Sequence, residues 1–381
     1  MAHIRRKGPS WVVDYRDPRG KGRSKSFRTK AEARRFEAAV ETAKNRGEWR
    51  DPRSGKVVFG RWMDTNRETW HGLSDSTTFQ REGFVRTHIA PRWGQAPIGA
   101  ITQLEVQGWV NALVAQGLSA STVRQVYQVF QRAMAGAVRS GLVASSPCQG
   151  IALPREAHNE MHFLAPEQVE ALADAADPHG ALILSAAYTG LRWGELVGLR
   201  RKHIHMLKSE VQVAEQLTEV NGRLAFKAPK TPQSRRIVSL PHFLVEVLAR
   251  HLEGASTDSD ALVFVGRDGK PLRRSNFRSR IWKPALELAG LNSELRFHDL
   301  RHTHVAFCIA QGMSEFRIMR RLGHTSIKTT LDRYGHLLPE EDDAFREGLD
   351  ALYRASRAGF SPDSSGSKVV ALPSTGGESG L

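Results

Sequence analysis

The segment from Ser119 to Val138 limits the fold more strongly than any other part of the sequence. Its apolar positions repeat with the 3.6-residue period of an α-helix. They are Val123, Val126, Tyr127, Phe130, Ala133, Met134, Ala137 and Val138. Ser119 or Ser121 can cap the first turn. A helix with one apolar face has to bury that face against neighbours, so we expect a helical domain here, with the stripe as its core and no cofactor in it.

Three shorter helical patterns precede this helix, around residues 59–70, 76–88 and 102–116. The sequence PRWG at 91–94 breaks the pattern after the second of them. Residues 57–152 therefore read as one helical domain.

The first 60 residues form a separate and unusually basic segment. Two strand-like runs, at 11–16 and 25–28, flank a turn rich in Pro, Gly and Lys, and a helical pattern begins at Thr29. A solvated or disordered basic arm is one interpretation. Aromatic and β-branched residues among the charges, such as Trp11, favour a folded sheet-and-helix module.

Charge and cysteine content indicate the partner and the compartment. The chain carries +15 net, of which residues 1–60 supply +10 through 17 Lys and Arg against 7 Asp and Glu. Such an excess of positive charge indicates a negatively charged partner, either nucleic acid or an acidic membrane surface. No run approaches the roughly 20 apolar residues of a membrane span, and the N-terminus does not resemble a secretory signal. Cys148 and Cys308 lie far apart, which favours a reducing compartment without disulfides. Nucleic acid in the cytoplasm is the leading interpretation.

A polar, aperiodic stretch at 153–162 reads as a linker to a second, mainly helical domain with a few strands. The expected strands are EVQVAEQL, RLAFKAP and RRIVSL, with an Asn-Gly hairpin signal after the first. We expect this domain to cover residues 163–355 and a disordered tail to cover 356–381, rich in Ser and Gly. The fold class is mainly α with small β-sheets (α+β), in several domains.

The motif HDLRHTH at 298–304 allows two interpretations. A zinc site would use His298 and His302, one helical turn apart, with Asp299 as the base. Arg301 falls on the same side of that helix and would repel a cation, and no third ligand stands at a recognisable spacing. Bidentate donors on Arg301 beside an imidazole suit an anion better. His304 is expected to point away, toward solvent or a helix end.

Other stretches supply matching chemistry. Arg192 in TGLRWGEL lies at an expected helix start, and Lys230 opens the hairpin loop KTPQS. His324 follows a Gly that can end a helix. Tyr334 shares the helical spacing of Ile327 and Leu331, so it should point inward. It is either a core tyrosine or, beside two arginines and two histidines, a nucleophile.

These motifs, in this order, resemble those of the tyrosine recombinases, and the phage-type integrases in particular. The resemblance covers nearly the whole chain. It implies an arm-type DNA-binding domain at 1–56, a core-binding (SAM-like) domain at 57–152 and a catalytic domain at 163–355.

The resemblance also implies roles for single residues. Tyr334 would attack the scissile phosphodiester and form a 3′-phosphotyrosyl link. Arg192 and Arg301 would bind the non-bridging oxygens, and Lys230 would protonate the departing 5′-oxygen, although Lys227 could compete for that role. His298 would manage the tyrosine proton, His324 would donate to the phosphate or brace the site, and Glu195 would orient its neighbours.

Elementary chemistry agrees with these roles. A tyrosine with a pKa of about 10 needs a base or nearby cations to react at neutral pH. Fixed cations can neutralise a phosphoryl transition state without a metal. The chain contains no GxxxxGK[ST] loop, so neither a metal nor a nucleotide cofactor is expected. His302, His304 and His336 have no assigned chemistry, and Tyr353 is expected to be structural.

The resemblance implies an integrase that binds double-stranded DNA at core and arm attachment sites and works as a homotetramer. A host DNA-bending protein, a directionality factor and a place at the nucleoid in the cytoplasm of a bacterial host follow from the same likeness. Two alternatives stay open. One is a type IB topoisomerase-like nicking and closing enzyme, and the other is a DNA-binding architectural protein with an inactive site.

Overall fold

The computed structural model describes residues 3–16, 20–45, 54–156, 161–229 and 232–335, together with Asp350 and Arg354. Lys230, His336, Tyr353 and the expected disordered tail lie outside the described residues. Within the described ranges no helix is long and apolar enough to cross a membrane.

The chain divides into two compact units. The first comprises residues 1–162, 215–228 and 265–277, and the second comprises 163–214, 229–264 and 278–381. The expected boundaries at 57, 153 and 163 stay predictions, since the division assigns the segments 215–228 and 265–277 to the first unit.

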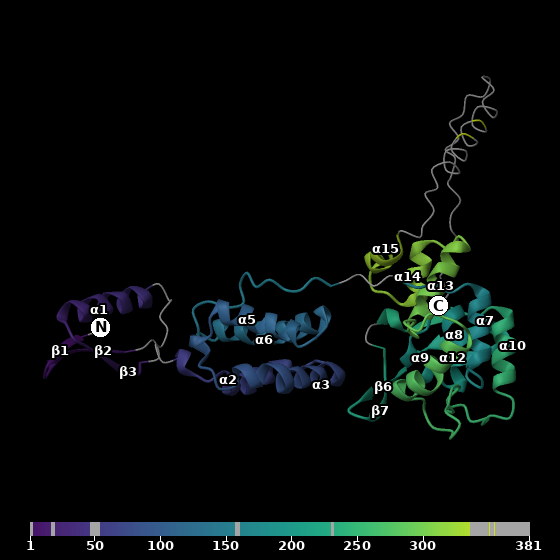
Figure 1. Ribbon diagram of the computed structural model, residues 1–381, viewed down its shortest axis with the longest axis horizontal. Helices are drawn as coiled ribbons and strands as arrows, with labels where there is room; N and C mark the ends of the chain where they lie inside the picture. Colours follow the sequence, from purple (N-terminus) through teal and green to yellow (C-terminus); the bar gives the residue numbers. More distant parts are fainter. Residues whose placement is uncertain are drawn as a thin grey trace, which may run out of the picture. The chain divides into compact units, whose positions relative to one another are not determined.

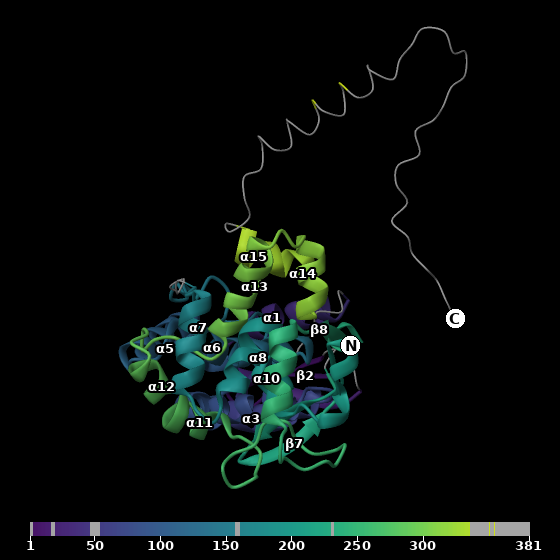
Figure 2. The same ribbon diagram turned by 90° about the vertical axis from the view of Figure 1, so that its right-hand side faces the viewer.

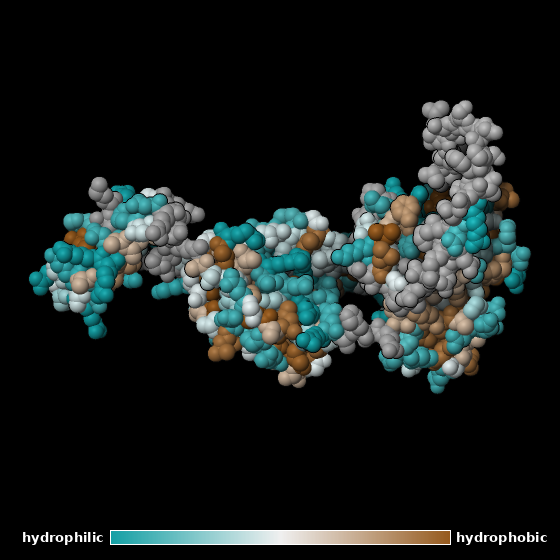
Figure 3. Space-filling view, turned by 90° about the horizontal axis from the view of Figure 1, so that it is seen from above, coloured by the Kyte–Doolittle hydropathy of each residue, from teal (hydrophilic) through white to brown (hydrophobic). Residues whose placement is uncertain are grey.

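The first unit begins with a three-stranded antiparallel sheet and one helix (Figure 1). The sheet has the order β1–β2–β3 and packs on α1; the bounds are β1 His3–Lys7, β2 Ser10–Arg16, β3 Gly22–Phe27 and α1 Lys30–Asn45. Val13, Tyr15, Ala33 and Val40 form a small separate core. A core of its own is what a folded module requires, so the interpretation as a disordered arm is wrong for these residues. Most of this module's surface in Figure 3 is hydrophilic.

Strand β1 was not expected from the sequence. Its residues HIRRK are mostly exposed and charged, so no hydrophobic alternation marks them. Pairing of Lys7 with Ser10 leaves a two-residue turn of Gly8 and Pro9. Gly8 has φ +59°, the positive value that type II′ hairpin turns need at their first position.

The rest of the first unit is mainly helical, and the helix expected from Ser119 is confirmed. The helices are α2 Phe59–Arg67, α3 Asp75–Phe84, α4 Ala90–Trp93, α5 Gln103–Ala115, α6 Ala120–Arg139 and α11 Arg274–Phe277. Single 3₁₀ turns lie at Ser54–Lys56, Glu68–Trp70 and Ile98–Ala100. Ser119 caps α6 by accepting a hydrogen bond from the Thr122 amide. In this core Trp93 stacks on Phe130 and meets Trp109 edge to face.

One expectation about this bundle is wrong. The break does not come at Pro91, because the chain continues helically through a π-type turn at Val85–Ile89 into α4 and leaves the helix only at the end of PRWG. Pro91 comes directly after the π-type turn, where the regular i to i−4 hydrogen-bond pattern is already interrupted, so its missing amide costs little. The helix ends at Trp93, which is buried.

The strands of the second half belong to two separate sheets. In the second unit β4 Ile204–His205, β5 Glu210–Val213 and β8 Arg236–Ser239 form an antiparallel sheet in the order β4–β5–β8. In the first unit β6 Gln216–Val220 and β7 Arg223–Lys227 form a hairpin. The run EVQVAEQL, expected as one strand, is therefore two. Asn221 and Gly222 have φ of +50° and +71°, which confirms the Asn-Gly turn.

Helices make up most of the second unit: α7 Pro166–Ala175, α8 Gly180–Thr189, α9 Trp193–Val197, α10 His242–His251, α12 Lys283–Leu288, α13 Asp299–Ala310, α14 Glu315–Leu322 and α15 Ile327–Tyr334. Short 3₁₀ turns lie at Arg201–His203, Met206–Lys208 and Pro232–Ser234, and a π-type turn lies at Arg278–Trp282. Helix α13 packs on α8 and α14, and α15 packs on α14. Figure 2 shows α13, α14 and α15 together at one end of the unit.

Candidate active site

Arg301 forms the centre of a polar cluster in the second unit. It lies in the first turn of α13 and is buried. Its guanidinium donates to the carbonyl oxygen of Gly190, to that of Leu322 at 2.7 Å, and to His324 Nε2 at 3.2 Å. The side chain thus connects α13 to the end of α8 and to the end of α14.

The pKa of Arg301 shows which charged groups lie near its guanidinium. Burial lowers the pKa of Arg301 to about 9, and the charge of Arg192 acts in the same direction. Glu195 and Tyr334 act in the opposite direction. The guanidinium still carries its charge at neutral pH, and Arg192 and Tyr334 both lie within its electrostatic reach.

Arg192 is held by the helix that follows it. It is the N-cap residue of α9, and Gly190 just before it takes the left-handed φ of +66° that ends α8. Glu195 accepts from the Arg192 amide and from its Nη1, both at 2.9 Å. The Arg192 side chain is 37% exposed, so it can still meet a ligand.

Glu195 is a buried carboxylate between two guanidiniums. Arg236 in β8 donates to its two oxygens at 3.1 and 2.9 Å. Burial alone would raise the pKa of Glu195. The hydrogen bonds and charge of Arg236, with the Arg192 amide and charge, outweigh that effect and hold the pKa at about 2. The carboxylate is therefore ionised at neutral pH.

His324 lies at the end of α14, where Gly323 takes φ +65°. Its Nδ1 lies 3.0 Å from Thr330 Oγ1, and its Nε2 faces Arg301. Because a guanidinium only donates, Nε2 must accept and the neutral ring carries its hydrogen on Nδ1. His324 thus links Arg301 to the helix that carries Tyr334.

Tyr334 is buried at the end of α15, and its hydroxyl lies 2.6 Å from His302 Nδ1. The two rings are 5.6 Å apart. His302 is buried as well, and it follows Arg301 directly in α13. His302 had no expected catalytic role, yet its ring lies against the hydroxyl of the expected nucleophile.

His298, to which the tyrosine proton was assigned, is the N-cap residue of α13, as expected, and is half-buried. Its ring meets that of His302 edge to face at 5.1 Å. Lys230 lies outside the described residues. Lys227, its possible competitor, lies in β7 and pairs with Asp75.

Two expectations about neighbouring residues are wrong. His304 does not face solvent: it is buried, its Nδ1 lies 3.1 Å from the Ala187 carbonyl, and its Nε2 accepts from Arg321 Nε at 2.8 Å. Burial, reinforced by the charge of Arg321, lowers the pKa of His304 to about 3. Nor do Ile327 and Leu331 share the burial of Tyr334, since they are 40% and 42% exposed.

Three side chains of the polar cluster therefore have contacts that the sequence did not predict: His302, Arg236 and Arg321. The second Arg of the RRIVSL run was a usable signal for Arg236, because it alternates with the apolar Val238 and Leu240, and a charged residue on a buried strand face needs a partner. Nothing in the local sequence marks Arg321.

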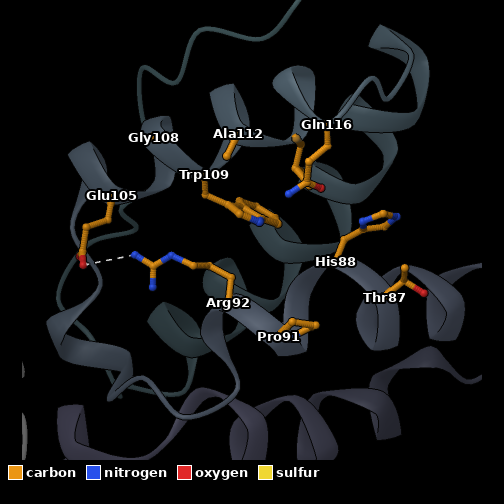
Figure 4. A pocket seen from close by; sticks show the side chains of 10 residues that line it. Thr87, His88, Pro91, Arg92, Glu105, Gly108, Trp109, Ala112 and Gln116 are labelled. Atoms are coloured by element: carbon orange, nitrogen blue, oxygen red, sulfur yellow. Dashed lines mark ion pairs between the residues drawn. The ribbon is translucent and has the colours of Figure 1, made fainter.

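Among the described residues no group of three or more His, Cys, Asp or Glu could hold a metal ion. A pocket in the helical part of the first unit (Figure 4) is lined by residues of α4, α5 and the π-type turn before α4. Arg92 and Glu105 pair across it at 3.5 Å. Its lining does not repeat the arginine, histidine and tyrosine set, so we do not place the chemistry there.

Comparison with known proteins agrees with this geometry. Residues 162–341 match the phage integrase family. The ICEBs1 integrase of Bacillus subtilis (strain 168) is 29% identical over 336 residues, which cover 84% of this chain and 90% of that protein. Residues 162–341 thus form a domain of the phage integrase family, and relatives of the chain include tyrosine recombinases. These likenesses support site-specific DNA recombination, and none of them favours the topoisomerase-like or inactive alternatives.

Solved structures show that the recombinase also shares its fold with relatives. A Tn1549 transposon integrase in complex with a circular intermediate DNA is similar with a TM-score of 0.67 at 18% identity, covering 78% of this chain and 99% of that one. A lambda integrase tetramer bound to a Holliday junction gives 0.53 at 20% identity, covering 85% and 95%. The expected fold class, mainly helical with small sheets, is confirmed.

Proposed function

We propose that this recombinase integrates and excises phage or other mobile DNA by cutting and rejoining it at attachment sites, with Tyr334 as the nucleophile. The observation that supports this most is the position of the Tyr334 hydroxyl. It is held at the end of α15 beside His302, within the electrostatic reach of the Arg301 guanidinium. That arrangement suits attack on a phosphorus bound by cations.

In the proposed reaction the Tyr334 oxygen attacks phosphorus and a 3′-phosphotyrosyl bond forms as the bond to the 5′-oxygen breaks. Arg192 and Arg301 neutralise the charge that builds on the non-bridging oxygens. Lys230 protonates the leaving 5′-oxygen, and His324 braces Arg301 or donates to the phosphate. Because the phosphotyrosyl link conserves the energy of the broken phosphodiester bond, rejoining by a 5′-hydroxyl needs no nucleotide.

Arg192 is prepared for this role by its neighbours. The ionised Glu195 fixes its amide and guanidinium, and Arg236 holds Glu195 in turn. An arginine whose orientation is fixed before substrate arrives stabilises the transition state without a cost of rearrangement. Glu195 therefore acts by orienting Arg192.

We further propose that residues 57–152 and 163–355 clamp the crossover site, while residues 1–56 bind separate arm sites. Two such contacts on one chain raise the effective concentration of the second. The lambda integrase structure is a tetramer on a Holliday junction, and a homotetramer on DNA is proposed here as well. A host DNA-bending protein and a directionality factor would assist at the nucleoid, in the cytoplasm of a bacterial host.

A nicked duplex that carries the crossover sequence, read from the junction between element and chromosome, tests the nucleophile. The nick lets the short 5′ fragment diffuse away and traps the covalent adduct, which an SDS gel resolves. We expect an adduct in the presence of EDTA, lost in Tyr334→Phe and kept in Tyr188→Phe, a matched change in the same unit. An adduct that survives in Tyr334→Phe would assign the attack to another residue.

A further inference from the structure

His302 has no role in the proposed reaction, yet it is the residue whose ring nitrogen contacts the Tyr334 hydroxyl. The distance from Nδ1 to the hydroxyl oxygen is 2.6 Å, and the exposed fractions of the two residues are 4% and 2%. A contact this short between buried groups is a hydrogen bond shielded from water, and the low local dielectric strengthens it.

The chemistry of the two groups sets the direction of this hydrogen bond. A free phenol holds its proton about 3.5 pKa units more tightly than a free imidazolium. Both groups are therefore neutral in the resting site, and with the hydrogen of His302 on Nε2 the Tyr334 hydroxyl donates to Nδ1. When the phenolic oxygen bonds to phosphorus it loses electron density and its proton becomes acidic, and the acceptor already in place is His302.

The arginines and carboxylates of the cluster are poor acceptors for this proton. Guanidiniums only donate. Glu195 is ionised but is bound on both oxygens by Arg192 and Arg236. Asp299 accepts from the Arg296 amide at 2.7 Å and from its guanidinium at 2.8 Å. The imidazole of His302 combines an accepting nitrogen with contact to the reacting oxygen.

We propose that His302 accepts the phenolic proton of Tyr334 during DNA cleavage, an inference that rests on the proposed function of Tyr334 as nucleophile. The proton passes from the hydroxyl to Nδ1, the oxygen bonds to phosphorus, and the 5′-oxygen leaves with a proton from Lys230. In rejoining, the 5′-hydroxyl returns its proton to Lys230 as it attacks phosphorus, and the imidazolium returns its proton to the departing tyrosyl oxygen.

Single-turnover cleavage of the nicked crossover duplex tests this assignment with three variants. His302→Asn keeps a polar atom near the Nδ1 position but cannot take up a proton. His298→Asn makes the same change one helical turn earlier, at the residue first expected to handle the proton. His242→Asn, on the exposed start of α10, is the matched control. We expect His302→Asn to slow adduct formation by about 100-fold or more, and His242→Asn to react like wild type.

A second substrate carries sulfur in place of the bridging 5′-oxygen. It distinguishes a residue that accepts the tyrosine proton from a residue that protonates the leaving group. A thiolate leaves without a proton, so this substrate should rescue a Lys230→Ala variant and leave His302→Asn slow. Rescue of His302→Asn would place His302 at the leaving group and overturn the proposal. A wild-type or faster rate in His302→Asn would overturn it too, since the hydrogen bond would then only hold or restrain Tyr334.

Thermal melting and gel-shift affinity for the same duplex establish that each variant folds and binds. Imidazole added to His302→Ala supplies an independent readout, because a missing base can be replaced from solution and a missing scaffold cannot. Failure to rescue that variant would count against proton transfer. Absence of a Tyr334-dependent adduct in wild type would instead overturn the proposed function itself.

Discussion

At the scale of single residues, the site depends on a carboxylate kept charged in the interior. Glu195 is 4% exposed and lies between Arg192 and Arg236. Taking a carboxylate out of water is costly unless its partners replace the lost hydrogen bonds. Both oxygens are satisfied here, so the charge orients Arg192 rather than destabilising the fold.

The variant Glu195→Gln tests this balance. The pKa of Glu195 lies at about 2 in the folded chain against an ordinary 4.5, so its stabilisation is full above pH 4.5 and is lost as pH falls toward 2. A shift of that size corresponds to about 3 kcal/mol. We expect urea unfolding at pH 7 to show a loss of about that size in the variant, with the gap from wild type narrowing below pH 4.5. Equal unfolding free energies at pH 7 would contradict the role.

Glu167→Gln is the control for that measurement. Glu167 lies on the exposed first turn of α7, where surface substitutions change stability little. The unfolding free energy of this variant should equal that of wild type at pH 7 and also below pH 4.5.

Residue chemistry could be predicted from the sequence where it depends on local order. The positions of Arg192 and Arg301 at helix starts were predicted because they depend on nearby residues alone. His302 and Arg236 were missed because their roles depend on which side chain meets them across the fold. His302 differs from His298 by one helical turn, and only the position of α15 decides which of them contacts Tyr334.

At the scale of elements, the junction of α8, α13 and α14 holds the site together. The carbonyl of Gly190, at the end of α8, accepts from Arg301 in α13. His304, also in α13, accepts from Arg321 in α14, which donates to the Tyr188 and Ser239 carbonyls as well. A shift of any of these ends would move Arg192, Arg301 or His324.

Gly190→Ala should loosen this junction. A Cβ at Gly190 would lie 2.5 Å from His304 Cδ2, and φ is +66°. Gly290 has nearly the same φ, +65°, with nothing within 4 Å of an added Cβ, so Gly290→Ala isolates the backbone strain. We expect that control to lose about 1 kcal/mol and Gly190→Ala to lose clearly more, with slower adduct formation. Equal losses of unfolding free energy in the two variants, measured with urea, would mean that the close contact of the added Cβ with His304 costs no stability.

Element prediction from sequence worked where one face of a helix is buried and failed where pairing is long-range. Helix α6 has an uninterrupted apolar stripe and a capping serine, so its bounds were nearly correct. Strand β1 has no buried alternation of its own and depends on its pairing with β2. The continuation through Pro91 was missed because a proline in a first helical turn resembles a break when only the sequence is read.

At the scale of the whole molecule, charge is distributed unevenly along the chain. Residues 1–56 hold 17 Lys and Arg against 7 Asp and Glu. Several of these cations lie on aromatic rings, such as Lys25 over Phe36 at 4.6 Å and Lys30 over Trp11 at 5.1 Å. A module with its own core and so many cations fits a phosphate-binding surface.

A variant that begins at residue 57 tests whether this module is a separate DNA contact. Because lost phosphate contacts reduce the slope of log affinity against log salt by about 0.9 each, we expect a shallower slope on full attachment-site DNA and no gel shift of arm-site DNA. Formation of the Tyr334 adduct on the short crossover duplex should persist. Removing residues 361–381, which hold one Lys and two acidic residues, should leave both properties unchanged. Arm-site binding that survives loss of the first 56 residues would place that contact in the helical or catalytic part of the chain.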